Sequence, residues 1–254
     1  MPELEPPKRP IMMHPDTTLH QIESIRAKLA TLQISKSVQN NWDEAERVQG
    51  VFSSNAIEGS TLTLGETEAV LRGATVPGKH LHDHIAAVNL NHAWLKMNDW
   101  AKGAVDERLL LEIHQILMTR INDDEAGRYR NVRVRIVGSE HIAPNPLSVP
   151  QKMAEAFKTF EELKGRHPIE QAADLHASIV TVHPFSDGNG RSARLMQNIA
   201  LIKTGYWPIV IPVTERAHYI DATYQSNTGN LAPYRKYIIE KVALAGMERL
   251  TMMG

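Results

Sequence analysis

The chain has 254 residues, of which 42% are hydrophobic and 22% charged, which is ordinary for a soluble globular protein of one large or two small domains. Its net charge of −1 argues against binding to a nucleic-acid backbone as its main task. The absence of cysteine excludes a disulfide framework, a thiolate nucleophile and a zinc-thiolate site.

The N-terminal residues 1–16 are rich in proline and charge and contain no apolar run. We expect them to form a flexible tail and not a signal peptide. No segment approaches the roughly 18 apolar residues that a membrane-spanning helix needs. The protein is therefore expected in the cytoplasm, without a membrane as partner.

From Thr17 onward, apolar residues recur at helical spacing, which predicts a mostly helical protein. Thr17 and Thr18 can cap the first helix, and Gly59 supplies a stop after the second. The second and later helices are expected at residues 35–57, 64–73, 80–102, 106–119, 149–163, 169–183, 191–203, 214–226 and 231–250.

The segment 131–146 departs from this helical pattern. Val132, Val134 and Ile136 alternate with arginines, and Gly138 then offers a turn. Such alternation followed by a turn predicts a β-hairpin. The expected fold class is therefore all-α, with a helical domain, a short β-hairpin and an N-terminal helical extension.

The stretch His183-Pro-Phe-Ser-Asp-Gly-Asn-Gly-Arg-Ser-Ala-Arg194 gathers chemically useful groups in one loop and helix start. His183 is its obvious proton acceptor, and Pro184 stops the preceding helix from simply running on. Asp187 offers hard oxygen ligands suited to Mg²⁺. The glycines that follow allow a tight turn before a helix N-terminus, which is a ready anion site. Together with two arginines three residues apart, these groups suit a polyphosphate and a hydroxyl nucleophile.

The pattern Gly188-x-Gly190-x-x-Ala193 also fits the dinucleotide-binding fingerprint. That fingerprint requires a strand running straight into the first glycine and a βαβ unit around it. The apolar residues before this loop recur at helical spacing, and a single strand-like run, 207–212, follows it. We therefore favour a polyphosphate site outside a dinucleotide-binding fold.

The stretch resembles the signature of the Fic family, His-Pro-Phe-x-Asp/Glu-Gly-Asn-Gly-Arg-x-x-Arg, and every specified position is met between His183 and Arg194. Fic enzymes mostly transfer a nucleoside monophosphate, usually AMP from ATP, to a protein hydroxyl. The resemblance implies a protein adenylyltransferase with ATP as substrate and Mg²⁺ as cofactor. Its partner would be a target protein with a Tyr, Thr or Ser hydroxyl; self-modification and a homo-oligomer stay open, and no nucleic acid or membrane is expected.

Carried onto this chain, the resemblance gives roles to the signature residues. His183 would take the proton from the target hydroxyl, and Asp187 would hold Mg²⁺ on the α- and β-phosphates. Six residues would bind the nucleotide, namely Gly188, Asn189, Gly190, Arg191, Arg194 and Tyr219.

Within this set, backbone amides and the side-chain amide of Asn189 would cradle the phosphates. Arg191 would neutralise the leaving pyrophosphate, and Arg194 would hold the γ-phosphate so that the α-phosphorus lies in line with the nucleophile. Tyr219 falls in a region that often contacts the nucleobase in this family. Phe185 is expected to pack inward and anchor the loop.

Two further stretches resemble features of the family. Gly127-x-Tyr129-Arg130 and the hairpin after it look like the flap, an edge that pairs with the target by main-chain hydrogen bonds. The resemblance assigns target docking to Val134, Ile136, Gly138 and His141. Ala143-Pro144 stands where many members carry two prolines, which leaves the flap's fine specificity open.

Ser54-Asn-Ala-Ile-Glu58-Gly59 is similar to the inhibitory motif Ser/Thr-x-x-x-Glu-Gly/Asn, placed as in the class with an N-terminal inhibitory helix. Glu58 is expected in the last turn of its helix, where the dipole disfavours a carboxylate by about 0.3–1 kcal/mol and a cation would offset this. In the family, that cation is the arginine matching Arg194. The resemblance thus implies autoinhibition by Ser54 and Glu58.

We expect three parts: a tail (1–16), a helical region with the inhibitory helix (17–75) and the catalytic core (76–254). Two other activities stay open: hydrolytic removal of AMP, with Glu58 orienting a water, and transfer of another nucleoside monophosphate such as UMP or GMP. A catalytically silent module that only binds nucleotide is disfavoured because the signature is intact.

The histidines at 80, 82 and 84 favour a surface cluster over a metal site, since residues two apart on a helix do not face each other.

Overall fold

The structure is a computed structural model and describes residues 15–135, 141–163 and 165–253. Within these ranges it contains helices and no strand, which confirms the all-α fold class. The α-helices are α1 (Pro15–Thr31), α2 (Lys36–Ile57), α3 (Leu64–Leu71), α4 (Leu81–Trp100), α5 (Glu107–Met118), α6 (Val149–Glu162), α7 (Pro168–Val182), α8 (Asn189–Lys203), α9 (Arg216–Asn227) and α10 (Ala232–Met253).

Local capping explains several of the helix starts. The Ser35 side chain accepts from the third residue of α2, and Asp106 does the same for α5. Thr63 and Glu66 form a capping box at α3. The predicted spans agree with these helices to within a few residues, although α1 begins at Pro15, two residues before the predicted start.

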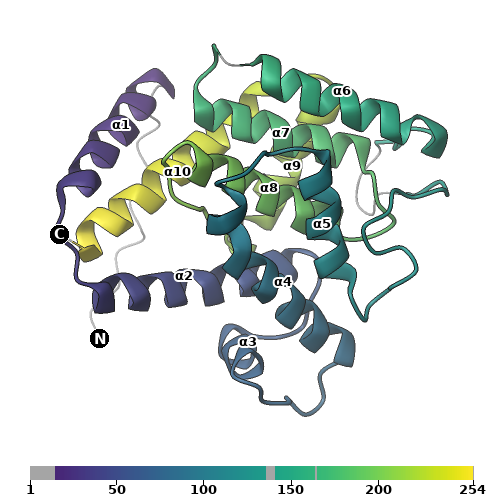
Figure 1. Cartoon of the computed structure of the whole chain (residues 1–254), viewed down its shortest axis with the longest axis horizontal. Helices are drawn as coiled ribbons and strands as arrows, with labels where there is room; N and C mark the ends of the chain where they lie inside the picture. Colours follow the sequence, from purple (N-terminus) through teal and green to yellow (C-terminus); the bar gives the residue numbers. More distant parts are fainter. Residues whose placement is uncertain (1–14, 136–140, 164, 254) are drawn as a thin grey trace, which may run out of the picture.

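Helix α8 is the centre of the domain. It packs against α7, α4 and α5, while α6 and α10 cover the outer side of α7 (Figure 1). Nearly every residue of α8 is buried, including polar ones, so each polar side chain needs an internal partner. Asn198, for example, both donates to and accepts from the backbone of Ile209 at 3.0 Å.

The N-terminal helices lie on one side of this centre. Helix α1 packs along α10, and α3 packs on α2 and α4 (Figure 1). Helix α2 crosses to α4 and touches α8, which brings the C-terminal end of α2 toward the start of α8. The division of the chain at residue 75 stays a prediction.

The expected β-hairpin does not form in the part that the structure describes. Its flanks, 131–135 and 141–145, are irregular, and Ile136 and Gly138 lie outside the described residues. A physical reason is that carbonyls of both flanks accept hydrogen bonds from the Arg130 side chain and not from a partner strand.

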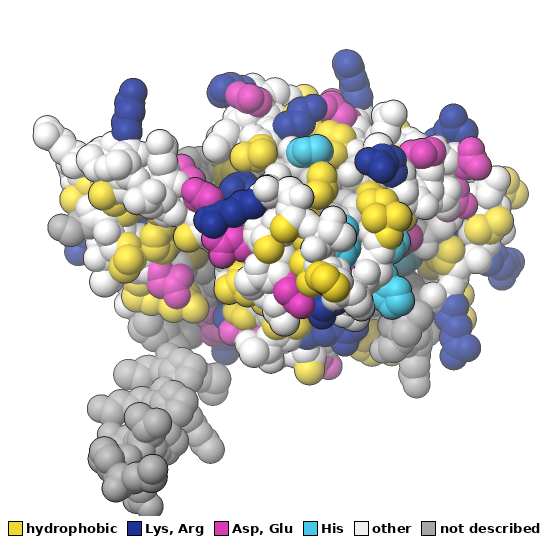
Figure 2. Space-filling view, turned by 90° about the horizontal axis from the view of Figure 1, so that it is seen from below, with side chains coloured by type: hydrophobic (Ala, Val, Ile, Leu, Met, Phe, Trp, Pro, Cys, Tyr) yellow, Lys and Arg dark blue, Asp and Glu magenta, His cyan; other side chains and the backbone are white. Residues whose placement is uncertain are grey.

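Residues 207–212 are irregular as well, and helix α7 precedes the glycine loop, so the dinucleotide-binding alternative lacks its strand. None of the helices within the described ranges is long and apolar enough to cross a bilayer. On the face shown in Figure 2, basic and acidic side chains are interspersed, as expected for a chain with little net charge.

Candidate active site

His183 ends helix α7 in a left-handed backbone conformation, with φ 50° and ψ 61°. The proline after it disfavours a helical conformation at His183, so the chain turns out of the helix at this residue. Burial lowers the pKa of the imidazole to about 4, and the nearby Arg130 guanidinium acts in the same direction against a backbone carbonyl that raises it. His183 is therefore neutral at pH 7 and able to accept a proton.

The loop after His183 is closed by Asn189. Its side-chain oxygen accepts from the Phe185 amide at 2.9 Å, and its side-chain nitrogen donates to the Phe185 carbonyl at 2.8 Å. These two bonds fix the Asn189 side chain in the loop and leave one of its two N–H groups, so its expected contact with the phosphates stays a prediction. Phe185 is fully buried, as expected, and stacks on the His114 ring with centroids 3.6 Å apart.

The start of α8 can accept an anion. Gly188 is its N-terminal cap, with φ 76°, and no side chain caps the first turn. Arg191 is 97% buried on this turn, and its Nε has no hydrogen-bond partner within the described residues. Open amides and an unsatisfied buried guanidinium nitrogen together favour a phosphate at this position.

Asp187 lies at the mouth of the loop, with 55% of its side chain exposed. Its carboxylate accepts from the Gly188 amide at 2.6 Å and from Arg191 at 3.0 Å. Partial burial alone would raise the pKa of Asp187, but the Arg191 charge and these hydrogen bonds outweigh it and hold the pKa below its ordinary value. An ionised, accessible carboxylate fits Mg²⁺, which proteins commonly bind through one or two carboxylates together with substrate phosphates.

Within the described residues, no cluster of three or more His, Asp or Glu side chains could hold a metal by itself. Asp187 would therefore need phosphate oxygens and water to complete the Mg²⁺ coordination.

Arg194 is buried one turn further along α8 and contacts the end of α2. Its Nη2 donates to the Glu58 carboxylate at 2.7 Å, and its Nε donates to the Ser54 hydroxyl at 2.9 Å. A third bond joins Nη2 to the Ser54 carbonyl at 2.9 Å. A Cβ added to Gly190 would lie 2.2 Å from the Glu58 carboxylate, so this carboxylate lies directly against the first turn of α8.

Tyr219 is 98% buried and lies against Arg194, not in an open pocket. Its hydroxyl accepts from Arg194 at 3.2 Å, because arginine has donors only, and it forms a hydrogen bond with His176 Nε2 at 2.9 Å. The structure leaves no open face of Tyr219 for a nucleobase, so the expected base contact does not fit this geometry.

Two residues that sequence reasoning missed border the site. His114 of α5 accepts from the Gly127 amide at 3.0 Å and so donates from Nε2 to the Asp187 carbonyl at 3.1 Å. Burial lowers the pKa of His114 to about 4, although the Asp187 contacts oppose this.

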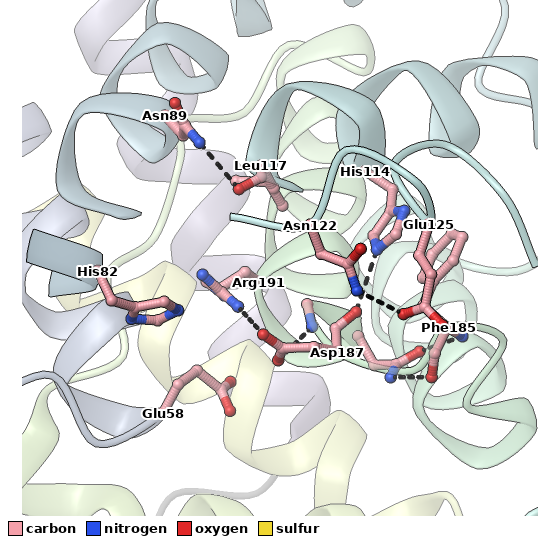
Figure 3. A network of polar contacts seen from close by, with 12 residues as sticks. Glu58, His82, Asn89, His114, Leu117, Asn122, Glu125, Phe185, Asp187 and Arg191 are labelled. Carbon is pink, nitrogen blue, oxygen red and sulfur yellow. Dashed lines mark hydrogen bonds and ion pairs between the residues drawn. The ribbon is translucent and has the colours of Figure 1, made fainter. Parts of the chain in front are cut away.

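Figure 3 shows His82, from the first turn of α4, on the same side of the site as Glu58 and Arg191. Only its position on a helix was visible in the sequence.

Of the expected flap residues, two are described. Val134 is half-buried, and His141 contacts the Thr181 carbonyl in the last turn of α7 at 2.8 Å. The structure therefore brings His141 close to the base-bearing end of α7.

A sequence model of the Fic/DOC family matches residues 104–201, from three residues before α5 into α8. Proteins named as Fic enzymes match a longer part of the chain. It is 31% identical over 229 residues to "Protein adenylyltransferase fic-1" of Caenorhabditis briggsae, covering 87% of this chain and 44% of that protein. Residues 104–201 of this chain form a Fic/DOC domain.

A second relative, "Protein adenylyltransferase Fic" of Nematostella vectensis, is 32% identical over 229 residues, which cover 87% of this chain and 52% of that protein. The chain thus spans about half the length of these relatives. Among solved structures, Fic-1 of C. elegans superposes with a TM-score of 0.81 at 29% identity, covering 94% of this chain and 72% of that chain. A Fic family protein of Desulfovibrio desulfuricans G20 gives a TM-score of 0.79 at 27% identity, covering 96% and 77%.

Proposed function

We propose that this protein is a protein adenylyltransferase, which transfers AMP from ATP to a hydroxyl side chain of a target protein. The observation that carries this proposal is the arrangement of one loop. A neutral imidazole stands at its start, and an uncapped helix N-terminus with an ionised Asp187 and two buried arginines stands at its end. The names of the relatives support the same reaction class.

In this reaction His183 takes the proton of the target hydroxyl as the oxygen attacks the α-phosphorus. The bond from that phosphorus to the β-phosphate oxygen breaks, and pyrophosphate leaves. Arg191 and the first amides of α8 would stabilise the charge that develops on the phosphates. Mg²⁺ held by Asp187 would neutralise part of the same charge.

We also propose that the described conformation is an inhibited one. The family resemblance assigns the γ-phosphate to Arg194, yet its Nη2 and Nε are bound to Glu58 and Ser54. The Glu58 carboxylate lies against Gly190 at the start of α8. A γ-phosphate that pairs with Arg194 would have to displace this carboxylate, because two anions so close together repel each other.

A second candidate is hydrolytic removal of AMP from a modified protein. It is favoured by the Glu58 side chain, which is 39% exposed and so able to orient a water beside the phosphate site. The two candidates respond oppositely to Glu58→Gly: AMP transfer rises, whereas AMP removal falls.

The test is intact-mass spectrometry of the Glu58→Gly protein after incubation with Mg²⁺ and each of ATP, GTP, UTP and CTP, alone and with cell lysate. We expect the added mass of AMP with ATP and none in the matched Glu58→Gly, His183→Ala protein. Added mass with another nucleotide alone would reassign the transferred group. No added mass on any protein would reject the transferase proposal.

A further inference from the structure

The backbone of His183 needs support from its surroundings. Among the described non-glycine residues, only Arg120 and His183 have a positive φ. This conformation crowds the Cβ of an ordinary residue and persists where neighbouring structure holds it in place. The direction of the imidazole depends on that backbone, so whatever holds it also aims the base.

The neighbour that holds this turn is Arg130. Its amide donates to the Pro184 carbonyl at 2.9 Å, and its Nε donates to the His183 carbonyl at 2.8 Å. Two successive carbonyls of the turn are thus bound by one residue. Since a carbonyl cannot rotate without turning its peptide plane, these bonds fix the turn at His183.

The other nitrogens of the same guanidinium bind the two segments that flank residues 136–140. Nη1 donates to the Val132 carbonyl at 3.0 Å, and Nη2 donates to the Pro144 carbonyl at 2.8 Å. Arg130 therefore joins three stretches of chain: the turn that carries His183 and both flanks of the expected target-docking segment.

Stability alone does not account for an arginine at this position. Arg130 is 96% buried and has no carboxylate partner within the described residues. A buried cation without a counterion carries a desolvation cost that an apolar residue at the same position would not carry. A planar fork that reaches three carbonyls in fixed directions is a property of arginine that lysine lacks.

We propose that Arg130 is a positioning residue that fixes the docked target hydroxyl relative to the imidazole of His183. This inference rests on the proposed transferase function. Transfer requires the hydroxyl oxygen, the imidazole and the phosphorus in near-attack geometry, and a misplacement of about 1 Å costs about 100-fold in rate. By holding the flanks and the turn with one rigid group, Arg130 prevents them from shifting independently.

The test compares Arg130→Gln, Arg130→Lys and the control Arg128→Gln, each in the Glu58→Gly protein. Arg128 lies two residues away on the same segment and is exposed, and its side chain donates to the Asp124 carbonyl at 3.3 Å and to no other group among the described residues. Self-labelling with α-³²P-ATP at saturating concentration measures transfer, and calorimetry with a non-hydrolysable ATP analogue and Mg²⁺ measures nucleotide binding.

For Arg130→Gln we expect transfer to fall by about 10- to 100-fold, with analogue affinity changed by less than about threefold. The transfer rate of Arg130→Lys should lie between that of Arg130→Gln and that of the parent Glu58→Gly protein. The transfer rate of Arg128→Gln should equal that of the parent. Unchanged transfer in Arg130→Gln, or an equal loss of transfer and analogue affinity, overturns the proposal.

Hydrogen–deuterium exchange of the same proteins gives a readout that does not depend on activity. Arg130→Gln should raise exchange in peptides covering 131–135, 141–145 and 183–188 together. A rise confined to the first two ranges would mean that Arg130 anchors the flanks without holding the base, which overturns the inference. If the parent labels no protein, lysate included, the transferase proposal fails, while the exchange result still decides whether Arg130 joins the three segments.

Discussion

Removing the Glu58 carboxylate is expected to raise the rate of AMP transfer about 10- to 30-fold. The carboxylate makes one charge-assisted bond of 2.7 Å to Arg194, a type of bond that contributes about 1.5–3 kcal/mol. Because the Glu58 side chain is 39% exposed, solvent screens the pair and reduces the contribution of this bond to about 1.5–2 kcal/mol. At about 1.4 kcal/mol per decade, this gives the stated range.

Glycine suits this position because Glu58 follows the last residue of α2 and Gly59, with φ 100°, already completes the turn. A graded series makes the test sharper. Glu58→Gln keeps a hydrogen bond from Arg194 to a neutral amide oxygen and should give a smaller rise in the rate of transfer. Ser54→Ala removes the hydrogen bond that the charged Arg194 guanidinium donates to a neutral hydroxyl, which contributes about 1.5 kcal/mol, and should raise the rate of transfer about tenfold.

The control is Glu44→Gln, which removes an exposed carboxylate from the same helix and should change nothing. The assay is the initial rate of label incorporation from α-³²P-ATP with Mg²⁺. Transfer that stays within about twofold of wild type in Glu58→Gly, with ATP binding intact, would refute the autoinhibition reasoning.

Three further predictions concern pH, metal and stability. In the uninhibited Glu58→Gly protein, kcat/KM should stay level as the pH falls to about 5 and drop only toward pH 4, because His183 stays neutral until its low pKa of about 4 is reached. A fall in kcat/KM centred at about pH 6.5, the ordinary pKa of histidine, would contradict this. Asp187→Ala should reduce the gain in ATP affinity on adding Mg²⁺ by about tenfold or more, as calorimetry with and without metal would measure. Tyr219→Phe should lower the free energy of unfolding by about 1–3 kcal/mol in urea titrations, because it leaves His176 Nε2 unpaired. The control Tyr224→Phe, at a half-buried tyrosine without such a bond, should cost less than about 0.5 kcal/mol.

Much of the fold followed from local rules. Apolar periodicity and capping residues such as Ser35 and Asp106 set the helix spans, because those bonds lie within one turn of the chain. The contact between Glu58 and Arg194, 136 residues apart, came from the family resemblance and not from spacing. The structure brings these two side chains together.

What the sequence could not provide were the other contacts that helices make around the site. His114 and Tyr219 contact the site through bonds to residues on other elements, and no spacing rule links such positions. The β-hairpin prediction rested on the alternation of side chains and took no account of what the carbonyls of Val132 and Pro144 would bond. A single buried side chain, Arg130, takes those acceptors, and one sequence gives no sign of that competition.

The most direct test of the account is to ask which phosphate of ATP is transferred and whether His183 is required. The Glu58→Gly protein would be incubated with Mg²⁺ and lysate in parallel reactions, one with α-³²P-ATP and one with γ-³²P-ATP. We predict protein labelling from the α-labelled nucleotide only, and none after adding His183→Ala. Labelling from the γ-position, or α-labelling that survives the loss of His183, would contradict an adenylyl transfer in which this imidazole is the base.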